Sequence, residues 1–134
     1  MSVFASPRFL RNVMLADAAS CAGTGALQVL FAPALAELLR IPAPLLLGTG
    51  VFLIVYAAAA TFVGTRQPVA RGWVALFAAG NVAWAVCCIA LLAGGALAPT
   101  ALGMAWVAAQ VVVVLLLADL QWMGIKRYPV QGWA

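Results

Sequence analysis

The residues best able to carry chemistry in this sequence are a few polar side chains inside long apolar stretches. A polar group within a hydrocarbon layer is costly unless it is paired, so such positions are rare and informative. A carboxyl group there could also carry a proton. The candidate residues, which we call the polar seam, are Asp17, Thr24, Gln28, Tyr56, Asn81, Trp84, Gln110 and Asp119.

Counting the helical rise from the nearest basic side chain sorts the polar seam by depth. At about 1.5 Å per residue, Asp17 and Asp119 both lie roughly 10 Å inside the same edge of the apolar region. The other members fall near the middle of this region or in its far half. The predicted layers therefore pair Asp17 with Asp119, Tyr56 with Asn81, and Gln28 with Gln110.

Helical spacing gives a second view of the seam, because side chains three or four positions apart share a helix face. On the first apolar stretch, Asp17 and Gln28 lie on one face. On the fourth stretch, a common face carries Trp106, Gln110 and Gln121. Asp119 is rotated away from this face. We expect the seam to face the interior of a helix bundle, with Asp119 as its least consistent member.

Two roles for the polar seam stay open. Hydrogen bonds between such side chains hold membrane helices together, at roughly 0.6 kcal/mol each on average. Small residues such as Ala19 and Gly23 would allow the close helix contacts that this role needs, and Arg11 could reach Asp17. In the second role, the seam lines a cavity for a lipophilic molecule or a path for protons. We expect Trp84 and Trp106, as aromatic residues in a helical stripe, to serve mainly in packing.

Other reactive groups are scarce. The sequence has no histidine, and its three cysteines form no C-x-x-C motif, which argues against a metal centre or a thiol redox site. No nucleophile–base pair or phosphate-binding loop is visible, so we expect a protein without catalytic activity or cofactor. The net charge of +4 is too small to indicate a nucleic-acid-binding surface.

The composition shows which elements must position the seam. Hydrophobic residues make up 67% of the 134 residues and charged residues only 7%, whereas roughly a quarter of a soluble domain is charged. About 20 apolar residues cross a bilayer as a helix, which satisfies its own backbone hydrogen bonds. We predict an all-α membrane protein in contact with lipid, one transmembrane domain over residues 1–134, with spans at about 12–32, 43–63, 72–97 and 100–125.

The links between the predicted spans are short. Residues 33–40 carry several leucines next to charged residues, which is typical of a short interfacial helix lying on the membrane. The next two links are a polar turn and a three-residue connection around Pro99. Such short links make neighbouring spans antiparallel, so we expect an up-down bundle of four transmembrane helices.

The basic residues predict the orientation. Cytoplasmic loops of membrane proteins carry an excess of lysine and arginine. With both termini in the cytoplasm of a bacterial cell, six basic residues lie inside and only Arg40 lies outside the inner membrane. The six are Arg8, Arg11, Arg66, Arg71, Lys126 and Arg127.

Several short motifs are spread over most of the chain. They are Asp17 followed by Gly23, the segments Asn81–Trp84 and Pro99–Gly103, Gln110, and the segment Asp119–Gly124. Through these motifs the chain resembles a family of small, uncharacterised four-span bacterial integral membrane proteins. The resemblance implies the four-span fold and its topology, and it implies no particular activity.

Two functions are consistent with these features. The first is a non-catalytic membrane protein that acts through helix–helix association, either as an accessory subunit of a membrane complex or as a homo-oligomer. Abundant small residues and very short loops favour it. The alternative is a binder or transporter of a lipophilic or cationic small molecule that uses the seam around Asp17 and Asn81.

Overall fold

The regular elements of the chain are all α-helices within residues 7–66, 70–95 and 97–127, which the computed structural model describes. Four of the helices are long and apolar enough to cross a membrane, and one is short. The prediction of an all-helical chain with four helices of spanning length is therefore confirmed. The helices are α1 (Pro7–Leu30), α2 (Ala32–Leu39), α3 (Ala43–Thr65), α4 (Arg71–Ala93) and α5 (Ala101–Arg127).

Proline and glycine set several helix boundaries, which differ from the predicted ones by a few residues. Helix α1 already includes Pro7, well before the predicted start of the span near residue 12, and the fixed φ angle of proline suits a position in the first helical turn. Helix α4 ends at Ala93, before the predicted residue 97. The chain turns at Gly95, whose φ of +73° is a conformation that glycine adopts without steric cost.

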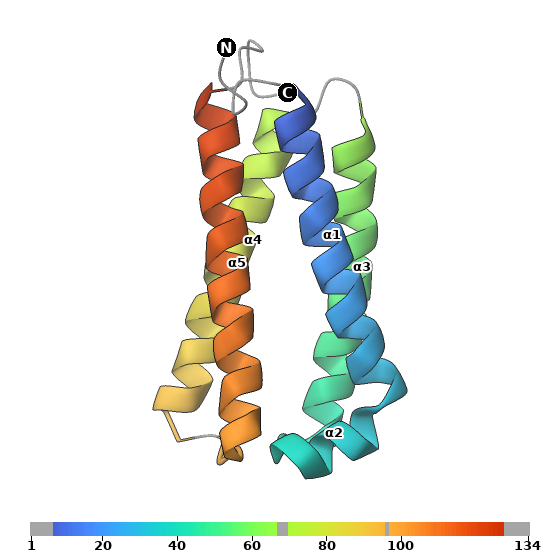
Figure 1. Ribbon diagram of the computed structural model, residues 1–134, viewed down its shortest axis with the longest axis vertical. Helices are drawn as coiled ribbons and strands as arrows, with labels where there is room; N and C mark the ends of the chain where they lie inside the picture. Colours follow the sequence, from blue (N-terminus) through green and yellow to red (C-terminus); the bar gives the residue numbers. More distant parts are fainter. Residues whose placement is uncertain (1–6, 67–69, 96, 128–134) are drawn as a thin grey trace.

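The four long helices lie alongside one another, and each runs in the opposite direction to the one before it (Figure 1). Helix α1 packs mainly on α3, and α4 mainly on α5. The two pairs meet chiefly through α1 and α5, whereas α3 and α4 touch only thinly. The end of the bundle that carries α2 is called the α2 end. The opposite end, where α1 begins and α5 ends, is called the distal end.

The contact between α1 and α3 is tight because two glycines face each other across it. A Cβ atom on Gly25 would lie 2.7 Å from the carbonyl oxygen of Gly50, so no larger side chain fits there without movement. The small residues expected to serve this purpose, Ala19 and Gly23, are exposed instead. That prediction was wrong, because Gly25 and not Gly23 lies on the face of α1 that packs against α3.

Helix α2 is held in place by the start of α5. The backbone N–H of Thr100 donates to the carbonyl oxygen of Leu39 at 3.1 Å. The hydroxyl group of Thr100 donates to the carbonyl oxygen of Leu38 at 2.9 Å. These bonds satisfy carbonyl groups at the end of α2 that have no partner within the helix. A Cβ atom on Gly103 would collide with the Leu39 carbonyl, so glycine permits the close approach.

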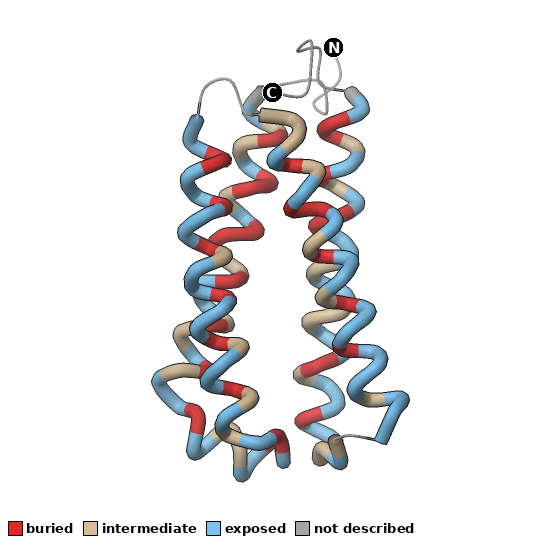
Figure 2. The backbone as a smooth tube through the Cα atoms, turned by 180° about the vertical axis from the view of Figure 1, so that it is seen from behind, coloured by how far each residue is buried: buried red, intermediate tan, exposed pale blue. Residues whose placement is uncertain are grey.

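Buried residues line the inward faces of the helices, and the outward faces are exposed (Figure 2). Many exposed side chains are large and apolar, including Leu30, Val55, Phe62 and Val112. Contiguous apolar surface of this kind is unfavourable in water and suits a hydrocarbon environment. The burial pattern and the helix lengths thus both point to lipid as the surrounding solvent.

Candidate functional site

Three buried polar side chains meet where α1, α4 and α5 approach one another. Asp17, Asn81 and Gln121, which we call the distal cluster, are 0%, 3% and 0% exposed. The Asn81 amide nitrogen Nδ2 donates to Asp17 Oδ2 at 3.0 Å and to Gln121 Oε1 at 3.1 Å. The Gln121 amide nitrogen Nε2 donates to Asp17 Oδ2 at 2.8 Å. The cluster is therefore a closed ring of hydrogen bonds that joins three helices.

The surroundings of Asp17 give it the role of a helix-linking acceptor. Its donors are neutral amides, and the thiol sulfur of Cys21 lies 3.5 Å from Oδ1. Within the part of the chain that the structure describes, Asp17 forms no ion pair, and the expected contact with Arg11 is not found. Buried polar groups in a membrane need such internal partners. The distal cluster thus fits the first of the two predicted roles, the linking of helices.

Asp119 does not belong to the interior of the bundle. Its side chain is exposed on the outer face of α4 and α5, in a hollow that is also lined by Ala75, Ala79 and Trp122. The predicted layer of Asp17 and Asp119 is wrong, because equal depth does not mean equal direction. Two residues along a helix correspond to a rotation of about 200°, so Gln121 faces Asp17 while Asp119 faces outward.

Tyr56 links α3 to α4, where the two helices have little other contact. Its hydroxyl group donates to the carbonyl oxygen of Phe77 at 3.0 Å, and the two rings pack edge to face with centroids 4.8 Å apart. Nearby, Phe52 stacks on Trp84 with centroids 5.7 Å apart. Tyr56 and Asn81, predicted as a layer, line the same groove without a mutual hydrogen bond.

Gln28 and Gln110 lie toward the α2 end and bind different partners. Gln28, which is 2% exposed, donates through Nε2 to the Leu46 carbonyl oxygen at 2.9 Å and to the Thr49 hydroxyl oxygen at 2.8 Å. Gln110 accepts a hydrogen bond from the Trp84 indole nitrogen at 3.2 Å. The predicted layer of these two glutamines is thus not a hydrogen-bonded pair, although both side chains border one cavity.

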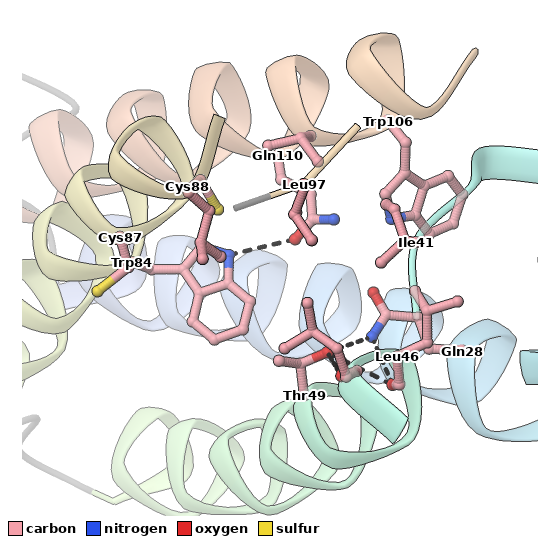
Figure 3. A pocket seen from close by; sticks show the side chains of 13 residues that line it. Gln28, Ile41, Leu46, Thr49, Trp84, Cys87, Cys88, Leu97, Trp106 and Gln110 are labelled. Atoms are coloured by element: carbon pink, nitrogen blue, oxygen red, sulfur yellow. Dashed lines mark hydrogen bonds between the residues drawn. The ribbon is translucent and has the colours of Figure 1, made fainter. Parts of the chain in front are cut away.

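This cavity lies between the two helix pairs, toward the α2 end (Figure 3). Its cavity volume is about 120 Å³. Side chains from all four long helices form its walls, and most are apolar, such as Leu46, Leu91 and Val107. Small-molecule sites are commonly concave and mostly apolar, as this cavity is.

Three polar atoms at the cavity have no hydrogen-bond partner among the described residues. The indole nitrogen of Trp106 is buried without a partner. The amide oxygen of Gln28 is free because its nitrogen must face the Leu46 carbonyl, and the amide nitrogen of Gln110 is free because its oxygen must face the Trp84 N–H. Figure 3 shows all three side chains bordering the same space. Two unpaired donors and one unpaired acceptor thus belong to side chains that line the cavity.

Thr24 borders a second hollow, between α1 and α5. Its other walls include Ser20, Ala109 and Val113. This hollow shares Trp84, Trp106 and Gln110 with the cavity. The two spaces therefore adjoin, and the second one lies along the junction of the two helix pairs.

No family model matches this sequence. No curated protein and no solved structure is significantly similar to it. The resemblance to small four-span bacterial membrane proteins therefore stays a prediction, and the functional conclusions rest on the geometry of the chain itself. In the described residues, no group of three metal-ligating side chains comes together.

The structure adds three residues that the predicted seam lacked. Gln121 completes the distal cluster, Thr49 holds Gln28, and Trp106 lines the cavity with an indole nitrogen that has no partner among the described residues. Helical spacing placed Gln121 on the same face as Gln110, whereas the count of depth selected Asp119. Spacing was therefore the better guide to the residue of α5 that faces the interior. Nothing in the sequence marks Thr49 or the unpaired indole nitrogen of Trp106, because both depend on how separate helices pack.

Proposed function

We propose that the chain is a multi-pass protein of a bacterial inner membrane that binds a lipophilic small molecule between its helix pairs, without catalysing a reaction. The observation that carries this proposal is the apolar cavity with its unpaired polar atoms. A buried donor without a partner is costly. A bound molecule that meets these groups recovers that energy, whereas the distal cluster is already satisfied by its own hydrogen bonds.

In this proposal the four long helices cross the membrane as an up-down bundle, and α2 lies at the outer interface. The distribution of charge supports this orientation, because cytoplasmic segments are rich in lysine and arginine. The α2 end carries Arg40, which follows α2, together with Glu37. The helix ends at the distal end carry Arg8, Arg11, Arg66, Arg71, Lys126 and Arg127.

Filling the cavity should displace the bound molecule. Cys88 is small and lies in the cavity wall, so Cys88→Phe is expected to reduce the amount of lipophile recovered with the purified protein by about tenfold, through steric exclusion. The measurement is solvent extraction of the detergent-purified chain followed by quantitative mass spectrometry. The matched control is Val86→Phe, which adds a ring at an exposed site on the same helix.

The control protein should retain its lipophile at the level of the unmodified chain. Equal recovery from the Cys88→Phe and Val86→Phe proteins would contradict the proposal, as would an unmodified chain that carries no lipophile beyond the surrounding detergent. Helical content and thermal stability, measured on the same samples, exclude misfolding as the cause of a loss.

A second candidate function is association with another copy of the chain through the outer face of α4 and α5. The exposed Asp119 favours it, since this carboxyl group makes no hydrogen bond or ion pair within the described residues and lies in a hollow with Ala75 and Ala79. A polar group on a lipid-facing surface gains from a partner helix, and small residues permit close approach.

If this association occurs, replacing Asp119 by leucine should convert an oligomer to monomers and leave the fold intact. The change removes the polar group that a neighbouring helix would satisfy, at a cost to association of about 1–2 kcal/mol. Native mass spectrometry of the gently extracted protein measures the oligomeric state. Asp119→Asn, which keeps a hydrogen-bonding side chain, should preserve the oligomer, and a monomeric unmodified chain would exclude this candidate.

A further inference from the structure

The cavity at the α2 end is suited to an uncharged ligand. Among the described residues, its lining contains no aspartate, glutamate, lysine or arginine. The buried carboxyl group of Asp17 is engaged by Asn81 and Gln121 in the distal cluster. A cationic or anionic head in the cavity would therefore meet no opposite charge, and burying an unpaired charge is strongly unfavourable.

The unpaired atoms specify the polar part of such a ligand. Trp106 Nε1 and Gln110 Nε2 are donors, and Gln28 Oε1 is an acceptor. A hydroxyl group can pair with donors and with an acceptor at once, because its oxygen accepts hydrogen bonds while its hydrogen is donated. A ketone or an ether offers acceptors only and would leave Gln28 Oε1 unpaired.

We propose that the cavity binds a neutral lipophilic alcohol, with the hydroxyl oxygen accepting from the side chains of Trp106 and Gln110 and the hydroxyl hydrogen donated to Gln28. This inference rests on the proposed function and narrows its ligand from any lipophile to an uncharged, hydroxyl-bearing one. It also assigns a specific role to Trp106, whose ring otherwise serves only to pack.

The hollow between α1 and α5 provides a place for the alkyl tail. It adjoins the cavity through Trp84, Trp106 and Gln110, and its remaining walls include Ala109 and Val113. These small and apolar side chains can line an alkyl chain. A ligand with its hydroxyl group in the cavity would thus extend its tail along the junction of the helix pairs, toward the surrounding lipid.

A photoreactive decanol with a diazirine in its chain tests this proposal on the full-length protein in detergent micelles. Mass spectrometry locates the cross-linked residues, and unlabelled molecules with the same tail compete at equal mole fraction. The competitors are 1-decanol, decyl methyl ether, decane and decyltrimethylammonium. We expect labelling at the cavity or its adjoining hollow, and we expect decanol to compete about tenfold better than decane or the cation.

Trp106→Phe isolates the contribution of the indole nitrogen. The substitution keeps an aromatic ring and breaks no hydrogen bond within the described residues, because Trp106 Nε1 has no partner there. We expect it to weaken competition by decanol about tenfold and to leave competition by decane unchanged. The thermal stability of the ligand-free protein should not fall. The matched variant Trp84→Phe breaks the bond to Gln110 and should lower that stability.

The possible results separate the inference from the proposed function. If the cavity is labelled but decane and decanol compete equally, the alcohol assignment is overturned and the cavity remains a site for lipophiles. The same holds if the Trp106→Phe protein binds decanol as well as the unmodified chain does. Loss of stability in Trp106→Phe equal to that in Trp84→Phe also overturns it. Preferred competition by the cation overturns the argument from neutrality. The proposed function itself fails if only outward-facing residues are labelled and the Cys88→Phe and Val86→Phe proteins yield equal amounts of lipophile. This result overturns both the lipophile site and the alcohol as its ligand.

Discussion

Replacing Asn81 by leucine is expected to lower the free energy of unfolding by about 2–4 kcal/mol. The substitution removes the two hydrogen bonds that Asn81 donates, to Asp17 and to Gln121. It leaves Gln121 Oε1 without this donor, and Asp17 keeps a single amide donor in a fully buried site. Because the ring joins α1, α4 and α5, its opening weakens the contact between the two helix pairs.

Reversible unfolding in mixed micelles of a mild detergent and dodecyl sulfate measures this change. Val82 is the neighbouring residue on α4 and is exposed, so Val82→Leu serves as the control and should alter the stability by less than about 0.5 kcal/mol. A loss below about 1 kcal/mol for Asn81→Leu would mean that the cluster does not hold the helices together. Combining Asp17→Asn with Asn81→Asp keeps one acidic and one amide group, and it should restore part of the stability.

The helical fold follows directly from the composition, because a chain so poor in charge must satisfy its backbone inside lipid. The ends of the helices were less predictable. Hydropathy placed the end of the third span near residue 97, whereas Gly94 and Gly95 end α4 earlier. A hydropathy average does not distinguish apolar residues within a helix from apolar residues that follow it. The end of the helix is set by the local backbone conformation instead.

The interior polar groups were predictable as a set but not as pairs. Asp17, Gln28 and Asn81 are buried as expected, because a polar side chain in a span must face other helices. Their partners depend on helix rotation, which is why Gln121 and not Asp119 meets Asp17. The cavity was not predictable, because it depends on how closely each pair of helices packs. Each helix packs closely on one neighbour and loosely on another, and the space between the two pairs results from that imbalance.

Replacing Gly25 by alanine is expected to lower the free energy of unfolding by about 2 kcal/mol, although alanine favours helix formation. The added Cβ atom would lie 2.7 Å from the Gly50 carbonyl oxygen and 3.2 Å from the Ile54 backbone nitrogen. Both obstacles are backbone atoms, so α1 and α3 must move apart. This movement also strains the hydrogen bonds from Gln28, one turn along α1, to Leu46 and Thr49.

Gly23 provides a control on the same helix, two residues away. A Cβ atom there meets no other atom within 4 Å, so Gly23→Ala should be neutral or should stabilise the chain by up to about 1 kcal/mol. The two substitutions make the same chemical change, so the difference between them isolates the helix contact from helix propensity. Similar stabilities for the Gly23→Ala and Gly25→Ala proteins would mean that α1 and α3 do not pack through the Gly25–Gly50 contact. Gln28 would then not be held against α3, and the amide oxygen that borders the cavity would lose its fixed direction.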